Sequence, residues 1–113
     1  MSRVYKILGL DEWREALRTG RFAGSTVDLQ DGYIHLSTAD QAQQTASRHY
    51  AGRAALVTLE LEADDLGEAL RWEPSRGGAL FPHLYGVLDV GLVRAVRQAP
   101  LGADGVPHVD LGA

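Results

Sequence analysis

The chain has 113 residues, 45% of them apolar, which suits one domain with its own hydrophobic core. It contains no cysteine, so disulfides, thiolate zinc sites and a cysteine nucleophile are excluded, and we expect a cytoplasmic location. A formal net charge of −4, from 11 basic and 15 acidic residues, argues against general duplex nucleic-acid binding but not against one small anionic ligand. The sequence shows neither a bilayer-length apolar run nor a signal-peptide pattern, so we expect no membrane association.

In chain order, the first half predicts a strand at residues 4–8, a helix after Asp11, a loop at 21–32, a strand at 33–37 and a helix from about 39 to 50. Asp11 is a favourable N-cap residue, and Gly20 suits the position after the last turn of the first helix. Thr38, followed three positions later by Gln41, is a capping-box pattern that predicts the start of the second helix.

The second half is dominated by predicted strands. They are residues 54–61, about 70–73 after a helical turn, about 93–99, and 106–111 after an Asp-Gly hairpin signal. The segment GALFPHLYG, residues 78–86, is expected to be extended, but Pro82 lacks a ladder donor and argues against a central strand there. Two early helices followed by successive strands predict an α+β fold with a mostly antiparallel sheet.

Three polar side chains, those of Tyr33, His35 and Ser37, fall on one side of the predicted strand YIHLS. Ser37 comes where the next helix begins, and the free amides of a helix N-terminus attract anions, phosphate especially. A hydroxyl, an imidazole and these amides together suit a phosphate or a ribose. The alternative interpretation is a solvated sheet face on which His35 bonds a neighbour.

A second polar-aromatic row lies in GALFPHLYG, where Phe81, His83 and Tyr85 share one side if the segment is extended. Because both rows are built around a histidine, we expect the two segments to converge on one cleft. The alternative is an aromatic loop that closes the core. Loops carry binding and catalytic residues more often than their share of the chain, which keeps the functional interpretation open.

Arg71 and Glu73 share one side of the predicted strand LRWEP. The guanidinium of Arg71 can fork onto a phosphate or a carboxylate. The carboxylate of Glu73 can orient a hydroxyl or act as a base. The alternative is an exposed cross-strand ion pair, which contributes little to stability.

Several common motifs are missing. The sequence has no GxGxxG, GxxxxGK[ST] or GxSxG, so a dinucleotide fingerprint, a P-loop and a hydrolase elbow are not predicted. The imidazoles of His35 and His83 suit Zn, Fe or Ni. However, there is no HxH or HExxH pairing, and His49 and His108 lie in unrelated contexts. We therefore predict no metal site.

The segments VYKI, DGYIHLSTADQ, LRWEP and LFPHLYGVL, in this order and at this length, resemble domain-of-unknown-function family 952, a family of small bacterial proteins. The resemblance runs from about residue 4 to residue 111, and GYIHLS and LFPHLYG carry most of it. This family looks like a remote relative of the ADP-ribosyltransferase fold, which includes the RNA 2′-phosphotransferases. The resemblance implies a compact single domain, with a split β-sheet and a cleft for NAD or an ADP-ribose-like group.

Carried over to this chain, the resemblance implies that His35 and Ser37 lie on the cleft strand, near the nicotinamide ribose or a phosphate. His83 and Tyr85 would then come from a facing loop. Glu73 is the candidate for the glutamate with which ADP-ribosyltransferases orient a ribose hydroxyl, although no motif aligns it. In the first strand, Lys6 stands where these enzymes often have His or Arg.

Three functions remain open. The first is an enzyme of ADP-ribose or NAD-related chemistry, with His35, Glu73 and His83 as catalytic residues. Its ligand contacts would be Tyr33, Ser37, Arg71, Phe81 and Tyr85. The second is a noncatalytic module that binds a nucleotide or another small anionic metabolite in the same pocket. The third is a structural or interaction protein whose motif residues close the core. The sequence indicates neither the ligand nor the oligomeric state.

Overall fold

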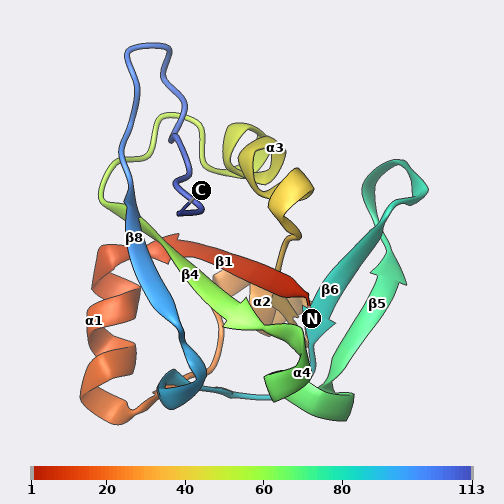
Figure 1. Ribbon diagram of the computed structural model, residues 1–113. Helices are drawn as coiled ribbons and strands as arrows, with labels where there is room; N and C mark the ends of the chain where they lie inside the picture. Colours follow the sequence, from red (N-terminus) through yellow and green to blue (C-terminus); the bar gives the residue numbers. More distant parts are fainter. Residues whose placement is uncertain (1, 113) are drawn as a thin grey trace.

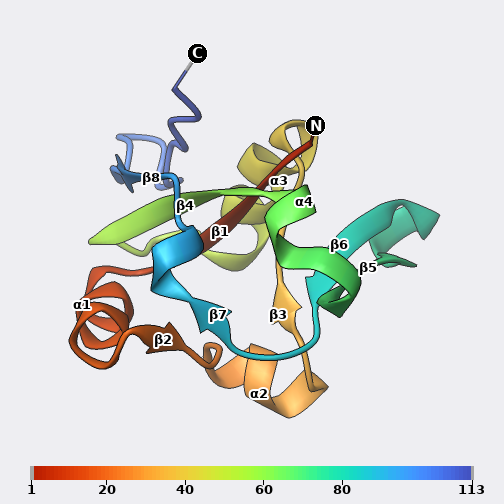
Figure 2. The ribbon, with the colours of Figure 1, turned by 60° about the horizontal axis from the view of Figure 1, so that its bottom comes forward.

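Two three-stranded antiparallel sheets form the frame of the computed structural model, which describes residues 2–112 (Figure 1). The first sheet has the order β1 (Arg3–Gly9), β4 (Leu56–Glu62) and β8 (Ala95–Ala99). The second has the order β3 (Ile34–His35), β6 (Leu80–Leu84) and β5 (Leu70–Pro74). A two-stranded ribbon pairs β2 (Arg21–Phe22) with β7 (Leu88–Asp89), as Figure 2 shows.

The helices connect these strands. They are α1 (Leu10–Thr19), α2 (Thr26–Asp31), α3 (Ala39–His49) and α4 (Ala63–Leu66), with 3-10 turns at Gly67–Ala69, Arg76–Gly78 and Val90–Leu92. The chain is thus an α+β single domain with mostly antiparallel pairing, as the sequence predicts. Within residues 2–112, no helix combines the length and the apolar character needed to cross a membrane.

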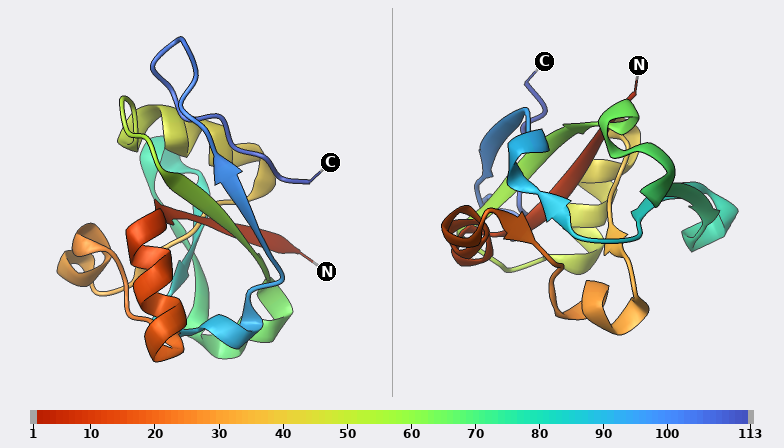
Figure 3. Two further views of the ribbon diagram at one scale, coloured as in Figure 1. Left: turned by 90° about the vertical axis from the view of Figure 1, so that its left-hand side faces the viewer. Right: turned by 90° about the horizontal axis from the view of Figure 1, so that it is seen from below.

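Both faces of the first sheet are buried, which explains why its strands are rich in apolar residues. On one face, Val57 and Leu59 of β4 pack in the main core with Trp13 of α1. On the other face, Ile7 of β1 packs with Ala46 of α3. The three strands therefore run between α1 and α3 (Figure 3).

The two sheets meet where the chain leaves β3. Tyr5 of β1 and Ser37 form an antiparallel bridge, with backbone N–H···O distances of 2.8 and 2.9 Å. Beyond this bridge β1 has no strand beside its outer edge within the described residues, because the second sheet turns away. This divergence leaves a gap along the outer edge of β1, and the gap becomes the cleft described below.

The predicted caps are partly right. α3 begins after Thr38, whose backbone N–H donates to Gln41 Oε1 at 3.0 Å, and it ends one residue before the predicted limit. Gly20 follows α1 with φ 85°, as predicted. The N-cap of α1, however, is Gly9 rather than Asp11, because the carboxylate of Glu12 reaches back to the Gly9 N–H at 3.0 Å.

The prediction of a loop over residues 21–32 is wrong. This segment contains β2 and the six-residue helix α2. A two-residue strand is too short to show an alternating pattern, and the one buried residue of α2 is Asp28. Since neither element presents an apolar stripe, neither gives the periodicity that identifies helices and strands.

The prediction that Pro82 excludes a central strand is also wrong, because β6 lies between β3 and β5. The Pro82 carbonyl accepts from the Leu36 N–H at 3.0 Å. The Pro82 nitrogen, which carries no hydrogen, points toward the same neighbour. This position lies one residue beyond the end of β3, where the chain turns away and pairs with Tyr5. No complete ladder is required at that position, so the proline is tolerated.

Two predicted strands are shorter than expected. Of residues 33–37, Ile34 and His35 form the ladder of β3. The last predicted strand, 106–111, is reduced to a bridge between Leu101 and Pro107, although Gly105 adopts the expected turn conformation with φ 80°. The backbone of Ser37 bonds to Tyr5 of β1, and the side chain of Gln43 bonds to the backbone of Pro107 and Val109, where a longer ladder was expected.

Candidate functional site

The second sheet separates its apolar and polar residues onto two faces. His35 lies directly opposite His83, and His83 lies directly opposite Arg71, so these three side chains share one face. Ile34 and Leu84 are paired on the other face and belong to the main core. The polar rows predicted on the three separate segments therefore lie side by side.

The two histidines come together as predicted. Their ring centroids are 5.7 Å apart, and Tyr33 stacks on His83 at 4.1 Å with an interplanar angle of 24°. Tyr33 also contacts the ring of His35 at 4.6 Å. The two segments are adjacent strands of one sheet, so His83 does not come from a facing loop.

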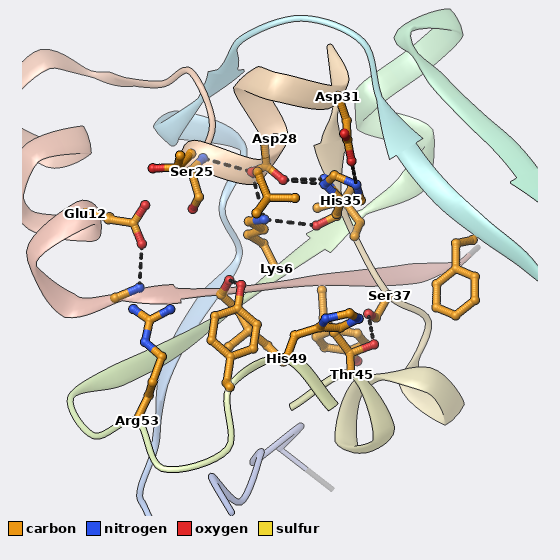
Figure 4. A pocket seen from close by; sticks show the side chains of 18 of the residues that line it. Lys6, Glu12, Ser25, Asp28, Asp31, His35, Ser37, Thr45, His49 and Arg53 are labelled. Carbon is orange, nitrogen blue, oxygen red and sulfur yellow. Dashed lines mark hydrogen bonds and ion pairs between the residues drawn. The ribbon is translucent and has the colours of Figure 1, made fainter. Parts of the chain in front are cut away.

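The histidine pair lies at a cleft of about 880 Å³ along the outer edge of β1 (Figure 4). Five of the eight predicted site residues line the cleft, namely Tyr33, His35, Ser37, Phe81 and His83. The other three, Arg71, Glu73 and Tyr85, do not line it and lie on the same sheet face beyond His83. Most of the remaining wall comes from β1, the start of α1, α2, α3 and the loop after α3. This volume lies within the range of small-molecule pockets in proteins.

Asp28 of α2 is bonded to three different residues at the cleft. Its carboxylate is 2% exposed and accepts from the backbone N–H groups of Ser25 and His35 at 2.9 and 3.1 Å. It also lies 2.6 Å from His35 Nδ1 and 2.9 Å from Lys6 Nζ. Burial opposes ionisation of Asp28, but the hydrogen bond from His35 and the charge of Lys6 outweigh it. The pKa of this carboxyl is therefore held well below its usual value.

Lys6 of β1 is 3% exposed, with its ammonium group between Asp28 Oδ2 and the His35 carbonyl oxygen, at 2.9 and 3.2 Å. Burial lowers the pKa of Lys6, and the charge of Asp28 counteracts this effect. Lys6 thus connects β1 to β3 and α2 across the cleft (Figure 4). Both residues lie outside the predicted site. Two signals point to Lys6, namely a charge within the apolar segment VYKIL and its place in the first strand, where the resemblance implies His or Arg. Asp28 gives no signal, because its segment resembles a loop.

His35 has a carboxylate at each ring nitrogen. Nδ1 faces Asp28, and Nε2 lies 2.9 Å from Asp31 Oδ2. Asp28 is buried and fixed, whereas the side chain of Asp31 is 46% exposed. The Nδ1 contact therefore orients the ring, and the Nε2 contact faces solvent, where a ligand can replace Asp31.

His83 is oriented by Glu73 of β5, whose Oε1 lies 2.7 Å from His83 Nδ1 and accepts from the Tyr85 hydroxyl at 2.8 Å. The hydrogen bonds from His83 and Tyr85 lower the pKa of Glu73. The hydrogen bond that the Tyr85 hydroxyl donates to Glu73 also raises the pKa of Tyr85. Arg71 stacks its guanidinium over the ring of Tyr85 at 4.8 Å. Glu73 thus holds the ring of His83 without itself lining the cleft.

The expectation of free helix amides beside Ser37 is wrong for the first of them, because the Thr38 N–H is occupied by Gln41. The Ser37 hydroxyl pairs with that of Thr45 on α3 at 3.0 Å. Ser37 therefore joins the segment after β3 to α3 at the cleft wall (Figure 4).

The far end of the cleft is formed by the last residues of α3 and the loop that follows. The hydroxyl of Tyr50 donates to the carbonyl of Ile7 at 2.9 Å, and burial, with a smaller effect of the Asp28 charge, raises the pKa of Tyr50 to about 12. The guanidinium of Arg53 stacks over this ring at 5.1 Å. This end of the cleft therefore combines the aromatic ring of Tyr50 with the positive charge of Arg53, and it is also lined by the acidic residues Asp11 and Glu12.

The arrangement provides two imidazoles, each fixed through Nδ1 by a carboxylate, beside an aromatic surface at a cleft. Such carboxylate–histidine pairs fix the orientation and the tautomer of the ring. Among residues 2–112 there is no cluster of three or more His, Asp or Glu able to hold a metal ion. The side chains present can supply hydrogen bonds, an aromatic stacking surface and sites for proton transfer.

Comparison with known proteins gives a family and close structural relatives. The X-ray crystal structure of protein CC0527 from Caulobacter crescentus is 54% identical, with a TM-score of 0.93 over 95% of this chain and 94% of that chain. A solution NMR structure of CC0527 is 55% identical, with a TM-score of 0.85 over 95% and 92%. No protein with a curated description matches. The family model described as "Protein of unknown function (DUF952)" matches residues 7–96, and the chain therefore belongs to this family.

Proposed function

We propose that the cleft binds a nucleotide with an ADP-ribose-like group and that His83 acts on this ligand as a general base, in an NAD-related transfer reaction. The observation that carries the proposal is the fixed pair of histidines at the cleft, 5.7 Å apart. The similarity to ADP-ribosyltransferases inferred from the sequence motifs is part of the proposal.

The tautomer of His83 supports a base at this position. Glu73 has a lowered pKa, so its ionised carboxylate accepts from both His83 and Tyr85. In a neutral ring the proton then lies on Nδ1, and Nε2 keeps its lone pair. Within residues 2–112, Nε2 of His83 has no hydrogen-bond partner. Glu73 therefore acts as a positioning residue, and His83 as the group that meets the ligand.

His35 and Ser37 supply ligand contacts in this proposal. The Asp28 carboxylate holds the ring of His35 through Nδ1, and a phosphate or ribose oxygen can take the place of Asp31 at Nε2. Tyr33 and Phe81 offer aromatic surface at the same cleft. Tyr85 donates to Glu73, and Arg71 stacks on Tyr85. In place of the predicted ligand contacts, these two residues therefore act on the site through Glu73.

The transfer requires one base. When the bond between ribose C1′ and nicotinamide nitrogen breaks, the nitrogen keeps the bonding electron pair and nicotinamide leaves as a neutral molecule. An acceptor hydroxyl or water then bonds to C1′ through its oxygen and loses its proton to His83 Nε2. The atoms and charges balance without another cofactor.

A noncatalytic binding module is the second candidate, and one observation favours it. The resemblance to ADP-ribosyltransferases requires a glutamate that touches the ribose, whereas Glu73 does not line the cleft. If no other carboxylate replaces it, the cleft would bind the nucleotide without turnover.

A thermal-denaturation screen against NAD, ADP-ribose and mononucleotides tests binding. A ligand at a hundredfold excess over its Kd adds about 2.7 kcal/mol and raises Tm by several degrees. Release of nicotinamide, measured by chromatography, tests turnover. We expect H83A to lose turnover and keep binding, while H108A, a histidine outside the cleft, keeps both.

The outcomes separate the candidates. Binding by the unaltered protein without any nicotinamide release identifies the noncatalytic module. The absence of a Tm shift with every nucleotide overturns both candidates.

A further inference from the structure

The outer edge of β5 is unpaired, because β5 is the last strand of its sheet within the described residues. The hairpin of β5 and β6 projects from the body of the protein (Figures 1 and 2). Two large apolar side chains are exposed on it, Trp72 at 42% and Leu80 at 52%. Exposed strand edges are templates for pairing with another strand, and natural proteins usually protect them.

The hydrogen-bond pattern shows which backbone groups face this edge. The Pro82 carbonyl points to β3, where it accepts from Leu36, so Pro82 directs no backbone group at β5. Trp72, directly opposite Pro82, is therefore in a non-hydrogen-bonded pair, and its own N–H and C=O point outward. The bond from Tyr85 N–H to the Ala69 carbonyl agrees with this alternation.

The sequence of β5, LRWEP, is complementary to itself about Trp72. If two β5 strands pair antiparallel with Trp72 opposite Trp72, the two outward N–H and C=O groups of each tryptophan bond each other. Arg71 of each copy then lies opposite Glu73 of the other. Opposite charges in directly paired positions stabilise antiparallel strands, and like charges destabilise them.

Both members of this charge pair have capacity for a partner. The Oε1 atom of Glu73 accepts from His83 and Tyr85, while its Oε2 atom has no partner among residues 2–112. Arg71 is exposed and stacks on Tyr85 without an ion pair in the same part of the chain. A guanidinium brought across the edge can therefore reach Glu73 without displacing His83.

We propose that two copies of this chain associate through their β5 strands, antiparallel and centred on Trp72, with Arg71 of each copy paired to Glu73 of the other. The three strands of each second sheet then join into one continuous sheet across a twofold axis. Because a single short strand contributes from each copy, the association is weak and depends on concentration. The dimer brings a cation to the carboxylate that orients His83. The proposed dimer does not depend on the proposed function, because the test measures association and not ligand binding or turnover.

Sedimentation equilibrium of the full chain, from about 10 µM to about 1 mM, tests the proposal in the concentration range of weak complexes. We expect R71E to raise the dimer dissociation constant roughly tenfold or more, since both cross-strand pairs become like-charged. E73R has the same effect for the same reason. An equimolar mixture of R71E and E73R restores association, because every pair in the mixed dimer is again of opposite charge. R14E, at an exposed arginine of α1, matches the charge change away from the edge and leaves association unchanged.

A second measurement does not depend on the stability of the variants. In the unaltered protein, amide hydrogen exchange at Trp72 slows as protein concentration rises, since its N–H becomes bonded in the dimer. Three results would overturn the proposal: a monomer at every concentration, a dimer that R71E and R14E weaken equally, or a Trp72 exchange rate independent of concentration. A mixture of R71E and E73R that stays monomeric would also overturn the pairing of Arg71 with Glu73.

Discussion

Replacing Asp28 by asparagine removes the charge that compensates Lys6 and leaves a buried ammonium group without its counter-ion. The two side chains are 2% and 3% exposed, and the distance between Asp28 Oδ2 and Lys6 Nζ is 2.9 Å. The substitution also weakens the contact to His35 Nδ1, but an amide oxygen can still accept one hydrogen bond there. The loss of charge compensation therefore dominates the expected effect.

The magnitude is bounded in two ways. Removing one partner of a buried ion pair costs about 3–5 kcal/mol in general. The unpaired Lys6 can also lose its proton, which costs about 4.6 kcal/mol at pH 7 because one pKa unit corresponds to 1.36 kcal/mol and lysine normally titrates near 10.4. We therefore expect D28N to lower the free energy of unfolding by about 3–5 kcal/mol at pH 7, a large part of the total for a domain of this size.

Urea denaturation followed by circular dichroism measures this loss, and its pH dependence identifies the cause. In the unaltered protein the pKa of Asp28 is lower when folded than when unfolded. The contribution of ionised Asp28 to the free energy of unfolding is therefore complete above its unfolded pKa of about 3.9. This contribution is lost as pH falls through the pKa of Asp28 in the folded protein. The difference between the unaltered protein and D28N should thus shrink in acid. It should also shrink at alkaline pH, where Lys6 loses its proton more easily.

Two variants act as controls. D31N alters an exposed aspartate that contacts the same histidine, and its effect on the free energy of unfolding should stay within about 1 kcal/mol. The double variant K6M/D28N removes both charges and should recover most of the loss. A cost for D28N no greater than for D31N, or no recovery in the double variant, would refute the reasoning.

Three further predictions concern single side chains. Y50F removes a buried hydrogen bond to the β1 backbone and should cost about 1 kcal/mol in chemical denaturation; the tyrosine that titrates at about 12 should vanish from an ultraviolet pH titration. E73Q removes the charge whose hydrogen bond raises the pKa of Tyr85, so that pKa should fall toward its ordinary value in an NMR titration. Gly24→Ala places a Cβ 2.8 Å from the Asp28 Cβ at φ +124° and should cost about 1–3 kcal/mol.

For each of these three predictions, one outcome would contradict the reasoning. A late-titrating tyrosine that persists in Y50F would assign the raised pKa to another side chain. An unchanged Tyr85 in E73Q would mean that burial, not the hydrogen bond, controls its titration. Gly20→Ala, at φ +85° with no atom within 4 Å of the added Cβ, is the control for Gly24→Ala. An equal cost at the two glycines would exclude the contact with Asp28.

The sequence was sufficient to predict which polar side chains of the site share one side of each segment, because strand alternation is a local property. The spacing of Tyr33 and His35, and that of His83 and Tyr85, fixes which side chains share a side as soon as the backbone is extended. The capping box of Thr38 and Gln41 is equally local, and the structure confirms it. The convergence of the two histidines follows from the pairing of β3 with β6 and was inferred from the similarity of their segments.

The tertiary structure alone decided which charges surround these rows. Lys6 and Asp28 are far apart in the sequence, and each looks like a surface residue until β1, β3 and α2 meet around the cleft. Burial raises the cost of an unpaired charge, so the position of one residue depends on the other, and a local pattern cannot encode that dependence. The role of Glu73 was decided in the same way, because its place beside His83 rather than at the cleft follows from the register of β5 with β6.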